Sequence, residues 1–158
     1  ELVSLIRKYF PHFGIGVGGY PEKHPESPSK NIDLLHLKEK VDAGADFITT
    51  QLFFDNQVYF QFREDCKSAK IEIPVLPGLL PVQSIGQVQR FCKMCEASLP
   101  GELQNKLEKV EKDRQPGVGT DWAKEQVKEL ISKGAPGFHL YALNQSEASL
   151  QILDWLKK

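Results

Sequence analysis

Four short, continuous apolar segments recur along the chain, and a stretch with helical periodicity follows each of them. The segments cover residues 13–20, 46–54, 73–80 and 137–143. A strand with both faces buried loses the alternation of polar and apolar residues, which is typical of parallel sheets. Because strands and helices alternate, the sequence predicts an α/β fold with parallel strands.

Apolar residues spaced three or four apart predict the helices of this fold. The expected helices cover residues 1–10, 31–43, 55–69, 84–95, 100–110, 120–134 and 146–156. Gly44 and Gly134 stand where C-terminal caps are expected, and Thr120 is expected to cap the sixth helix at its N-terminus. Four strand–helix units make either a small open sheet or half of an eightfold barrel, which needs about 250 residues.

Composition narrows the class of protein. The chain of 158 residues has 20 Lys and Arg against 21 Asp and Glu, a net charge of -1, whereas a nucleic-acid binder normally has a basic excess. No apolar run is long enough to span a bilayer, so no membrane association is expected. The three cysteines cannot all pair in disulfides, which predicts a reducing, cytoplasmic location.

Two local motifs have a functional and a structural interpretation. Cys92 and Cys95 match the CxxC spacing of redox and zinc sites, but no second CxxC and no paired histidines follow. Two small apolar residues one helical turn apart are the favoured interpretation, and no metal site is predicted.

Residues 14–19 match GxGxxG, but the glycines lie inside the expected strand and prolines follow in place of a helix. We therefore reject a dinucleotide-binding fingerprint.

Polar side chains gather near the expected carboxyl ends of strands, where α/β proteins bind ligands. His24 lies in a proline-rich turn after the first strand, and Gln51 near the end of the second offers a donor and an acceptor to a heterocycle. Asp33, His36 and Lys40 form a polar stripe on the intervening helix. The stripe is either a solvated face or a set of contacts to ribose and phosphate.

Six segments together resemble the methylenetetrahydrofolate reductase family. They are GYP at 19–21, HPE at 24–26, DLLHLKEKVDAGA at 33–45, TQLFF at 50–54, PGLLP at 77–81 and FHLYALN at 138–144. The resemblance runs in order over nearly the whole chain and covers the C-terminal half of the family's catalytic domain. It implies that residues 1–158 supply strands five to eight of a (β/α)8 TIM barrel.

The resemblance also implies an activity. The family reduces 5,10-methylenetetrahydrofolate to 5-methyltetrahydrofolate with NAD(P)H and non-covalently bound FAD, in one-carbon and methionine metabolism. A homo-oligomer is expected for the full-length protein. The family's catalytic acidic residues come from the first half of the barrel, so no catalytic residue is expected in this segment, and the segment alone is expected to be inactive.

Individual residues take their roles from the matching motifs. The residues implied in FAD binding are Tyr20, His24, Asp33, His36 and Lys40. Those implied in substrate binding are Gln51 at the pterin edge, Phe91 stacked on folate or nicotinamide, and Tyr141 near the pterin end. Ala45 is implied to affect FAD retention indirectly, through packing. Gln145 departs from the family, which often has Arg at this position.

Two alternatives stay open at this point. One is a catalytically inactive half-barrel that binds a partner. The other is a different (β/α)8 flavoenzyme, such as a relative of proline dehydrogenase, although Gln51 between Thr50 and the LFF segment argues against it.

Overall fold

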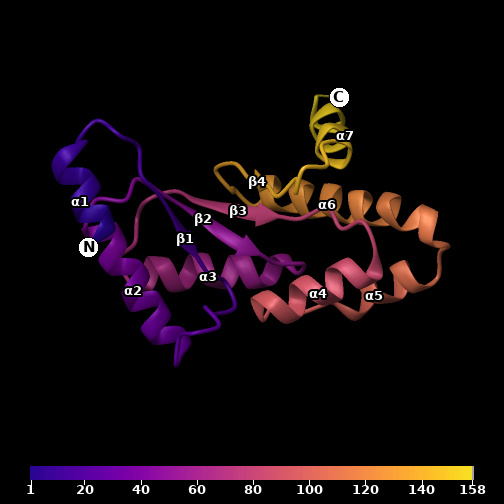
Figure 1. Cartoon of the computed structure of the whole chain (residues 1–158), viewed down its shortest axis with the longest axis horizontal. Helices are drawn as coiled ribbons and strands as arrows, with labels where there is room; N and C mark the ends of the chain where they lie inside the picture. Colours follow the sequence, from indigo (N-terminus) through magenta and orange to yellow (C-terminus); the bar gives the residue numbers. More distant parts are fainter. Residues whose placement is uncertain (158) are drawn as a thin grey trace.

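The computed structural model describes residues 1–157 and contains a four-stranded parallel sheet (Figure 1). The strands are β1 (Gly16–Gly19), β2 (Phe47–Leu52), β3 (Val75–Leu79) and β4 (His139–Leu140). They lie in the order β1-β2-β3-β4, and each pairs in parallel with its neighbour in sequence. The predicted parallel α/β fold is confirmed. The unreversed order is that of a barrel, because a doubly wound open sheet reverses its strand order.

Every expected helix forms. They are α1 (Leu2–Tyr9), α2 (Lys30–Asp42), α3 (Asn56–Ser68), α4 (Ile85–Cys95), α5 (Gly101–Glu108), α6 (Gln115–Ser132) and α7 (Glu147–Leu156), with a 3-10 turn at Lys112–Arg114. Across residues 1–157, no helix combines the length and the apolar character that crossing a membrane requires.

The start of α6 differs from the expectation. The helix begins at Gln115, and Thr120 lies inside it, where its hydroxyl donates to the carbonyl oxygen of Pro116 at 2.8 Å. The predicted N-terminal cap at Thr120 is therefore wrong. Proline suits the first turn of a helix because its fixed φ is already helical and its missing N–H needs no partner there.

The main core lies between the sheet and the helices that cover one of its faces. Alternate residues of β2 are buried, namely Ile48, Thr50 and Leu52, and the residues between them are half-buried. Helices α2, α3, α6 and α7 complete this core with Leu37, Tyr59, Phe62, Cys66, Ala123, Val127, Leu130 and Ile152. Since side chains alternate across a strand, Gln51 faces the less covered side of the sheet.

A second apolar cluster lies beyond the carboxyl ends of β2 and β3. Its buried members are Leu52, Phe54, Leu80, Val82, Val88, Cys95, Leu103 and Leu107. Here α6 approaches the backbone so closely that a Cβ added at Gly119 would lie 1.9 Å from the carbonyl oxygen of Val82. Phe91 and Tyr141 pack against this cluster, which places α4 at the end of the sheet where a ligand is expected.

An ion pair ties α1 to the amino end of the sheet. The Arg7 guanidinium donates to the Asp46 carboxylate at 2.8 Å and to the carbonyl oxygens of Pro11 and Phe13. The same carboxylate accepts the backbone N–H of Ile15 at 2.7 Å. The Ile15 N–H, and then Arg7, lower the pKa of Asp46 below its ordinary value of 3.8.

We expect Asp46→Asn to lower the Tm at pH 7. A carboxyl group whose pKa is lowered on folding stabilises the fold above its unfolded pKa, and this contribution is lost as the pH falls through the folded pKa. The Tm difference from wild type should therefore shrink between pH 7 and a pH well below the ordinary value of 3.8. Thermal unfolding followed by circular dichroism at both pH values measures it. Asp113→Asn, in the exposed 3-10 turn, is the control. An undiminished difference at low pH contradicts the assignment.

Candidate active site

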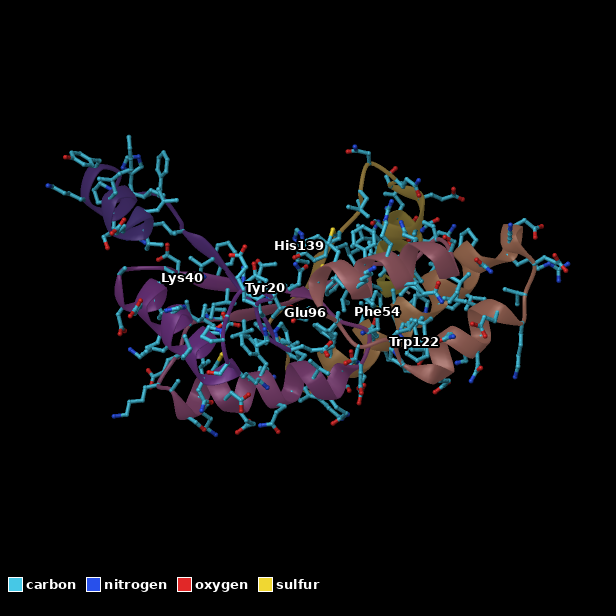
Figure 2. All side chains as sticks on the ribbon, turned by 60° about the horizontal axis from the view of Figure 1, so that its bottom comes forward. Tyr20, Lys40, Phe54, Glu96, Trp122 and His139 are labelled. Atoms are coloured by element: carbon cyan, nitrogen blue, oxygen red, sulfur yellow. The ribbon has the colours of Figure 1, made fainter. Side chains whose placement is uncertain are left out.

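Three predicted site residues lie at the carboxyl ends of the strands. Tyr20 directly follows β1, Gln51 is the penultimate residue of β2, and Tyr141 directly follows β4. Because parallel strands have their carboxyl ends on the same side of a sheet, the backbones of these three residues lie close to one another. Tyr20 and His139, the residue two before Tyr141, both lie in the central part of the molecule in Figure 2.

The loop after β1 brings Tyr20 and His24 together. Their ring centroids are 4.4 Å apart, with an angle of 71° between the planes. The backbone N–H of His24 donates to the Asp33 carboxylate at 2.9 Å, and His24 Nδ1 accepts the Glu26 N–H at 3.1 Å. Burial, followed by the charge of Asp33, raises the pKa of the Tyr20 hydroxyl, which stays protonated as a donor. The loop thus holds the two aromatic rings next to each other.

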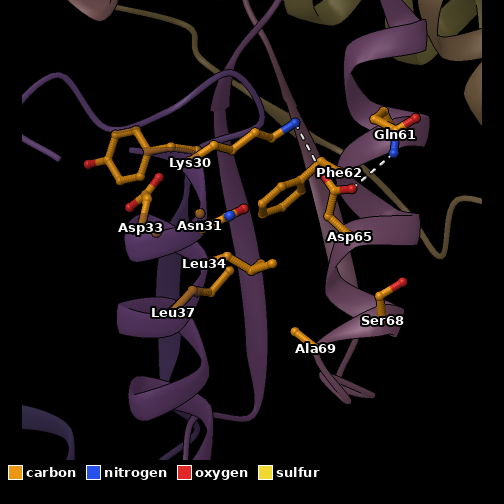
Figure 3. A pocket seen from close by; sticks show the side chains of 13 residues that line it. Lys30, Asn31, Asp33, Leu34, Leu37, Gln61, Phe62, Asp65, Ser68 and Ala69 are labelled. Atoms are coloured by element: carbon orange, nitrogen blue, oxygen red, sulfur yellow. Dashed lines mark hydrogen bonds and ion pairs between the residues drawn. The ribbon is translucent and has the colours of Figure 1, made fainter. Parts of the chain in front are cut away.

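The polar stripe of α2 faces two different grooves. Asp33 lies on a groove of about 510 Å³ between α2 and α3 (Figure 3). His36 and Lys40 line another groove, of about 480 Å³, between α1 and α2. There the Lys40 ammonium lies 3.5 Å from the carbonyl oxygen of Gly18 in β1. The structure keeps His36 and Lys40 together but directs Asp33 to the other groove.

Charged groups on the rim of the α2–α3 groove pair with one another. Lys30 lies 2.9 Å from the Asp65 carboxylate, and Gln61 donates to the same carboxylate at 2.9 Å, as the dashed lines in Figure 3 show. One oxygen of Asp33 holds the loop after β1. The contacts of Asp33 in this structure therefore order the loop that carries Tyr20 and His24.

Gln51 and Tyr141 are fixed by backbone groups of β2. The Gln51 side-chain oxygen accepts the N–H of Leu52 at 2.9 Å, which leaves its NH₂ group and a second lone pair for a ligand. The Tyr141 hydroxyl donates to the carbonyl oxygen of Thr50 at 2.9 Å. A Cβ added at Gly78 would lie 2.2 Å from that oxygen and 2.8 Å from the Tyr141 ring. Glycine is therefore needed to seat this ring.

Phe91 is half-buried on α4, and its neighbour Arg90 was not found by sequence reasoning. The Arg90 guanidinium lies 5.4 Å from the Phe91 ring centroid, within the range of a cation–π contact. Arg90 and Gln145 both line a cavity of about 210 Å³ between the loops after β3 and β4. A single exposed arginine on a helix gives no pattern, so only the fold reveals this cation beside Gln145.

The CxxC motif behaves as part of the packing. Cys92 and Cys95 are free thiols, half-buried and buried. Burial raises the pKa of Cys92 to about 11 and also raises that of Cys95. Because the thiolate is the reactive and metal-binding form, these thiols suit packing better than redox chemistry or zinc binding.

Comparison with known proteins decides the family. Residues 1–157 match the family model described as methylenetetrahydrofolate reductase. The chain belongs to this family. It is 40% identical over 154 residues to the 5,10-methylenetetrahydrofolate reductase of Escherichia coli (strain K12), covering 96% of this chain and 52% of that protein. It is 39% identical over 166 residues to methylenetetrahydrofolate reductase (NADH) 1 of Arabidopsis thaliana, covering 97% of this chain and 28% of that protein. The chain thus spans about half the length of the bacterial relative and a smaller share of the plant relative.

A solved structure shares the fold. It is described as an uncharacterized protein from Clostridium thermocellum that binds two copies of 5-methyl-5,6,7,8-tetrahydrofolic acid. It matches with a TM-score of 0.64 at 20% identity and covers 98% of this chain and 57% of that chain. At this identity the likeness supports the architecture alone.

In this member of the methylenetetrahydrofolate reductase family, the groove of His36 and Lys40 offers a cation and an imidazole that fit the phosphate and ribose groups of FAD, beside the carboxylate of Glu39. The Lys40 ammonium is held loosely by the Gly18 carbonyl oxygen, so its charge is available to a phosphate. A Cβ added at Gly18 would meet nothing closer than the Tyr20 ring, at 4.0 Å. The open backbone therefore admits a close ligand.

Proposed function

We propose that residues 1–158 form the C-terminal half of a single (β/α)8 catalytic domain. The sequential strand order supports this, as does the position of β1 and β4 at the two edges of the sheet. The terminal helices expose apolar side chains, which are Leu2, Leu5 and Tyr9 on α1 and Leu150, Leu153 and Leu156 on α7. Four further strand–helix units would pair both edges and cover these faces.

The proposed activity is the FAD-dependent reduction of 5,10-methylenetetrahydrofolate to 5-methyltetrahydrofolate by NAD(P)H. One observation carries it. A chain of this family brings the Tyr20–His24 ring pair and Gln51 to one edge of a parallel sheet, with Lys40 in a groove beside β1. Bound FAD would supply a hydride carrier between the nicotinamide and the folate.

On the cofactor side, the chain contributes charge and aromatic surface. Lys40 would neutralise a phosphate, and His36 lines the same groove and would contact the ribose–phosphate region. Tyr20 and His24 would contact the flavin ring. Asp33 would hold their loop in place through the His24 N–H, in addition to any contact with the ribose.

On the substrate side, the chain contributes orientation. Gln51 would donate to and accept from the edge of the pterin, with its side chain fixed by the Leu52 N–H. Phe91 would stack on the folate or the nicotinamide, and Tyr141 would border the pterin end. We assign no proton donor to this chain, because an acidic residue from the other half of the barrel would fill that role.

Other features fit a reductase of this kind. Cys66, Cys92 and Cys95 are free, which supports a reducing compartment, and we place the protein in the cytoplasm. A homo-oligomer stays a prediction. Membership of the reductase family argues against a relative of proline dehydrogenase.

A product assay tests the proposed function. The full-length protein with FAD is given a nicotinamide donor and 5,10-methylenetetrahydrofolate, and 5-methyltetrahydrofolate is quantified. We expect formation of the product to require both FAD and the nicotinamide. Proline with an artificial electron acceptor is the comparison substrate and should give no turnover. Binding of folate without any product would favour the inactive binding module instead.

A further inference from the structure

Two polar contacts fasten the end of α4 to the loop after β1. The Glu22 carboxylate accepts the backbone N–H of Ser98 at 2.8 Å and also the Ser98 hydroxyl, across 76 residues of sequence. Next to it, the Lys23 ammonium lies 3.4 Å from the Glu96 carboxylate. Figure 2 shows Glu96 in the same central region as Tyr20. We call these two contacts the α4 fastening.

The loop side of the fastening is already ordered. The Lys23 ammonium donates to the carbonyl oxygens of His24, Pro25 and Ser27 at 2.9, 3.3 and 3.0 Å. Lys23 also has a φ of 153°, a conformation that residues other than glycine rarely adopt. The loop is therefore wrapped around the same cation that meets Glu96, and it presents its carboxylate, Glu22, in a fixed place.

The two ends of α4 are held differently. At its start, the buried Gln115 side chain accepts the Ile85 N–H and donates to the Leu107 carbonyl oxygen, each at 3.0 Å. At its end, Cys95 is buried in the second apolar cluster, Glu96 has a φ of 51° and stops the helix, and the polar contacts that follow are exposed. The apolar face of the helix is therefore anchored in the second cluster, while the polar fastening beyond Cys95 lies at the surface beside β1. Phe91 lies between these two points.

We propose that Glu22 is a positioning residue, which sets the distance between Phe91 and the Tyr20–His24 ring pair. The inference rests on the proposed function, in which the substrates bind against Phe91 and the flavin binds against Tyr20 and His24. With the fastening closed, α4 holds Phe91 at one separation from the cofactor side. With it released, the surface end of α4 moves and the space for the substrate loses its fixed width.

Steady-state kinetics of Glu22→Ala in the full-length protein test this role. We expect the KM values for the nicotinamide and the folate to rise about fivefold, because Glu22→Ala removes both exposed hydrogen bonds to Ser98. The kcat and the Kd for FAD should stay within about twofold, because Glu22 is placed in contact with neither substrate nor cofactor. Glu22→Gln keeps an acceptor for the Ser98 N–H and should recover most of the affinity.

Ser98→Ala and a matched control complete the design. Ser98→Ala should raise both KM values in the wild-type background but add less than about twofold to Glu22→Ala, because the two residues form one contact. Glu72→Ala removes an exposed carboxylate elsewhere and should behave as wild type. Independent effects of Glu22 and Ser98, or a loss of kcat at unchanged KM, would overturn the proposal.

Hydrogen exchange separates this proposal from the proposed function. In Glu22→Ala, the amides of residues 92–98 should exchange at least about fivefold faster, and those in the centre of α6 should be unchanged. This readout needs no turnover, so it holds even if the protein makes no 5-methyltetrahydrofolate. Unchanged exchange in residues 92–98 would show that Glu22 does not hold α4. Faster exchange with unchanged KM values in an active enzyme would reject its positioning role.

Discussion

Replacing Gln51 by Ala is expected to slow the transfer from the reduced flavoprotein to 5,10-methylenetetrahydrofolate about 100-fold, the cost of removing a hydrogen-bonding group built for one substrate edge. Reduction of the flavin by the nicotinamide should stay within about twofold, because that step needs no pterin contact. The Leu52 N–H holds the side chain in place, so the loss reflects a positioned amide rather than a mobile one. Anaerobic stopped-flow spectroscopy measures the two half-reactions separately.

Two further variants sharpen this test. Gln57→Ala removes an exposed amide from α3 and should leave both half-reactions unchanged. Gln51→Glu keeps the length of the side chain but replaces the NH₂ donors with an acceptor, so it should also impair folate use. Equal loss in both half-reactions of Gln51→Ala would contradict the role assigned to Gln51.

Replacing Lys40 by Met is expected to weaken FAD binding about 30-fold, because a charge-assisted contact to phosphate is lost while the aliphatic stem stays. The Lys40 ammonium faces the groove between α1 and α2 and lies 3.5 Å from the Gly18 carbonyl oxygen. Wild-type affinity should fall as salt is added, and the variant should respond less, since screening acts on the lost charge. Titration of the FAD-free protein, followed by flavin fluorescence, gives both values.

Lys38→Met is the matched control for Lys40. It lies on the same helix two residues away and pairs with Asp42 instead of facing the groove. Its FAD affinity should equal that of wild type. Equal FAD affinity in Lys40→Met and Lys38→Met would contradict the proposed contact between Lys40 and a phosphate of FAD.

The sequence predicted which strands and helices form, but it did not predict where each of them begins and ends. Continuous apolar runs identified all four strands. The burial on both faces that such runs predict is not seen in β2, where buried and half-buried residues alternate. The run at 137–143 pairs only at His139–Leu140, and the positive φ values of Leu143 and Asn144 turn the chain soon afterwards. The start of α6 differs from the prediction because the helix begins with Pro116 in its first turn, so Thr120 lies inside the helix and is not its cap.

The sequence placed the candidate site residues on their strands and helices but did not give their geometry. Periodicity placed Asp33, His36 and Lys40 on one stripe, yet the neighbours of the helix direct Asp33 to a different groove. Helical spacing shows which residues share a face of the helix, but it does not show which other elements of the fold pack against that face. For the same reason the contact of Glu22 with Ser98 had no sequence signal, because it joins two loops that only the fold brings together.

The most direct test of the proposed reductase is the visible absorbance spectrum of the purified full-length protein during two anaerobic additions. We expect flavin absorbance that bleaches when NADH or NADPH is added and returns when 5,10-methylenetetrahydrofolate follows. A protein that stays colourless and takes up no added FAD would contradict the proposal and leave a half-barrel binding module. A bleached flavin that the folate does not restore would contradict the substrate assignment built on Gln51.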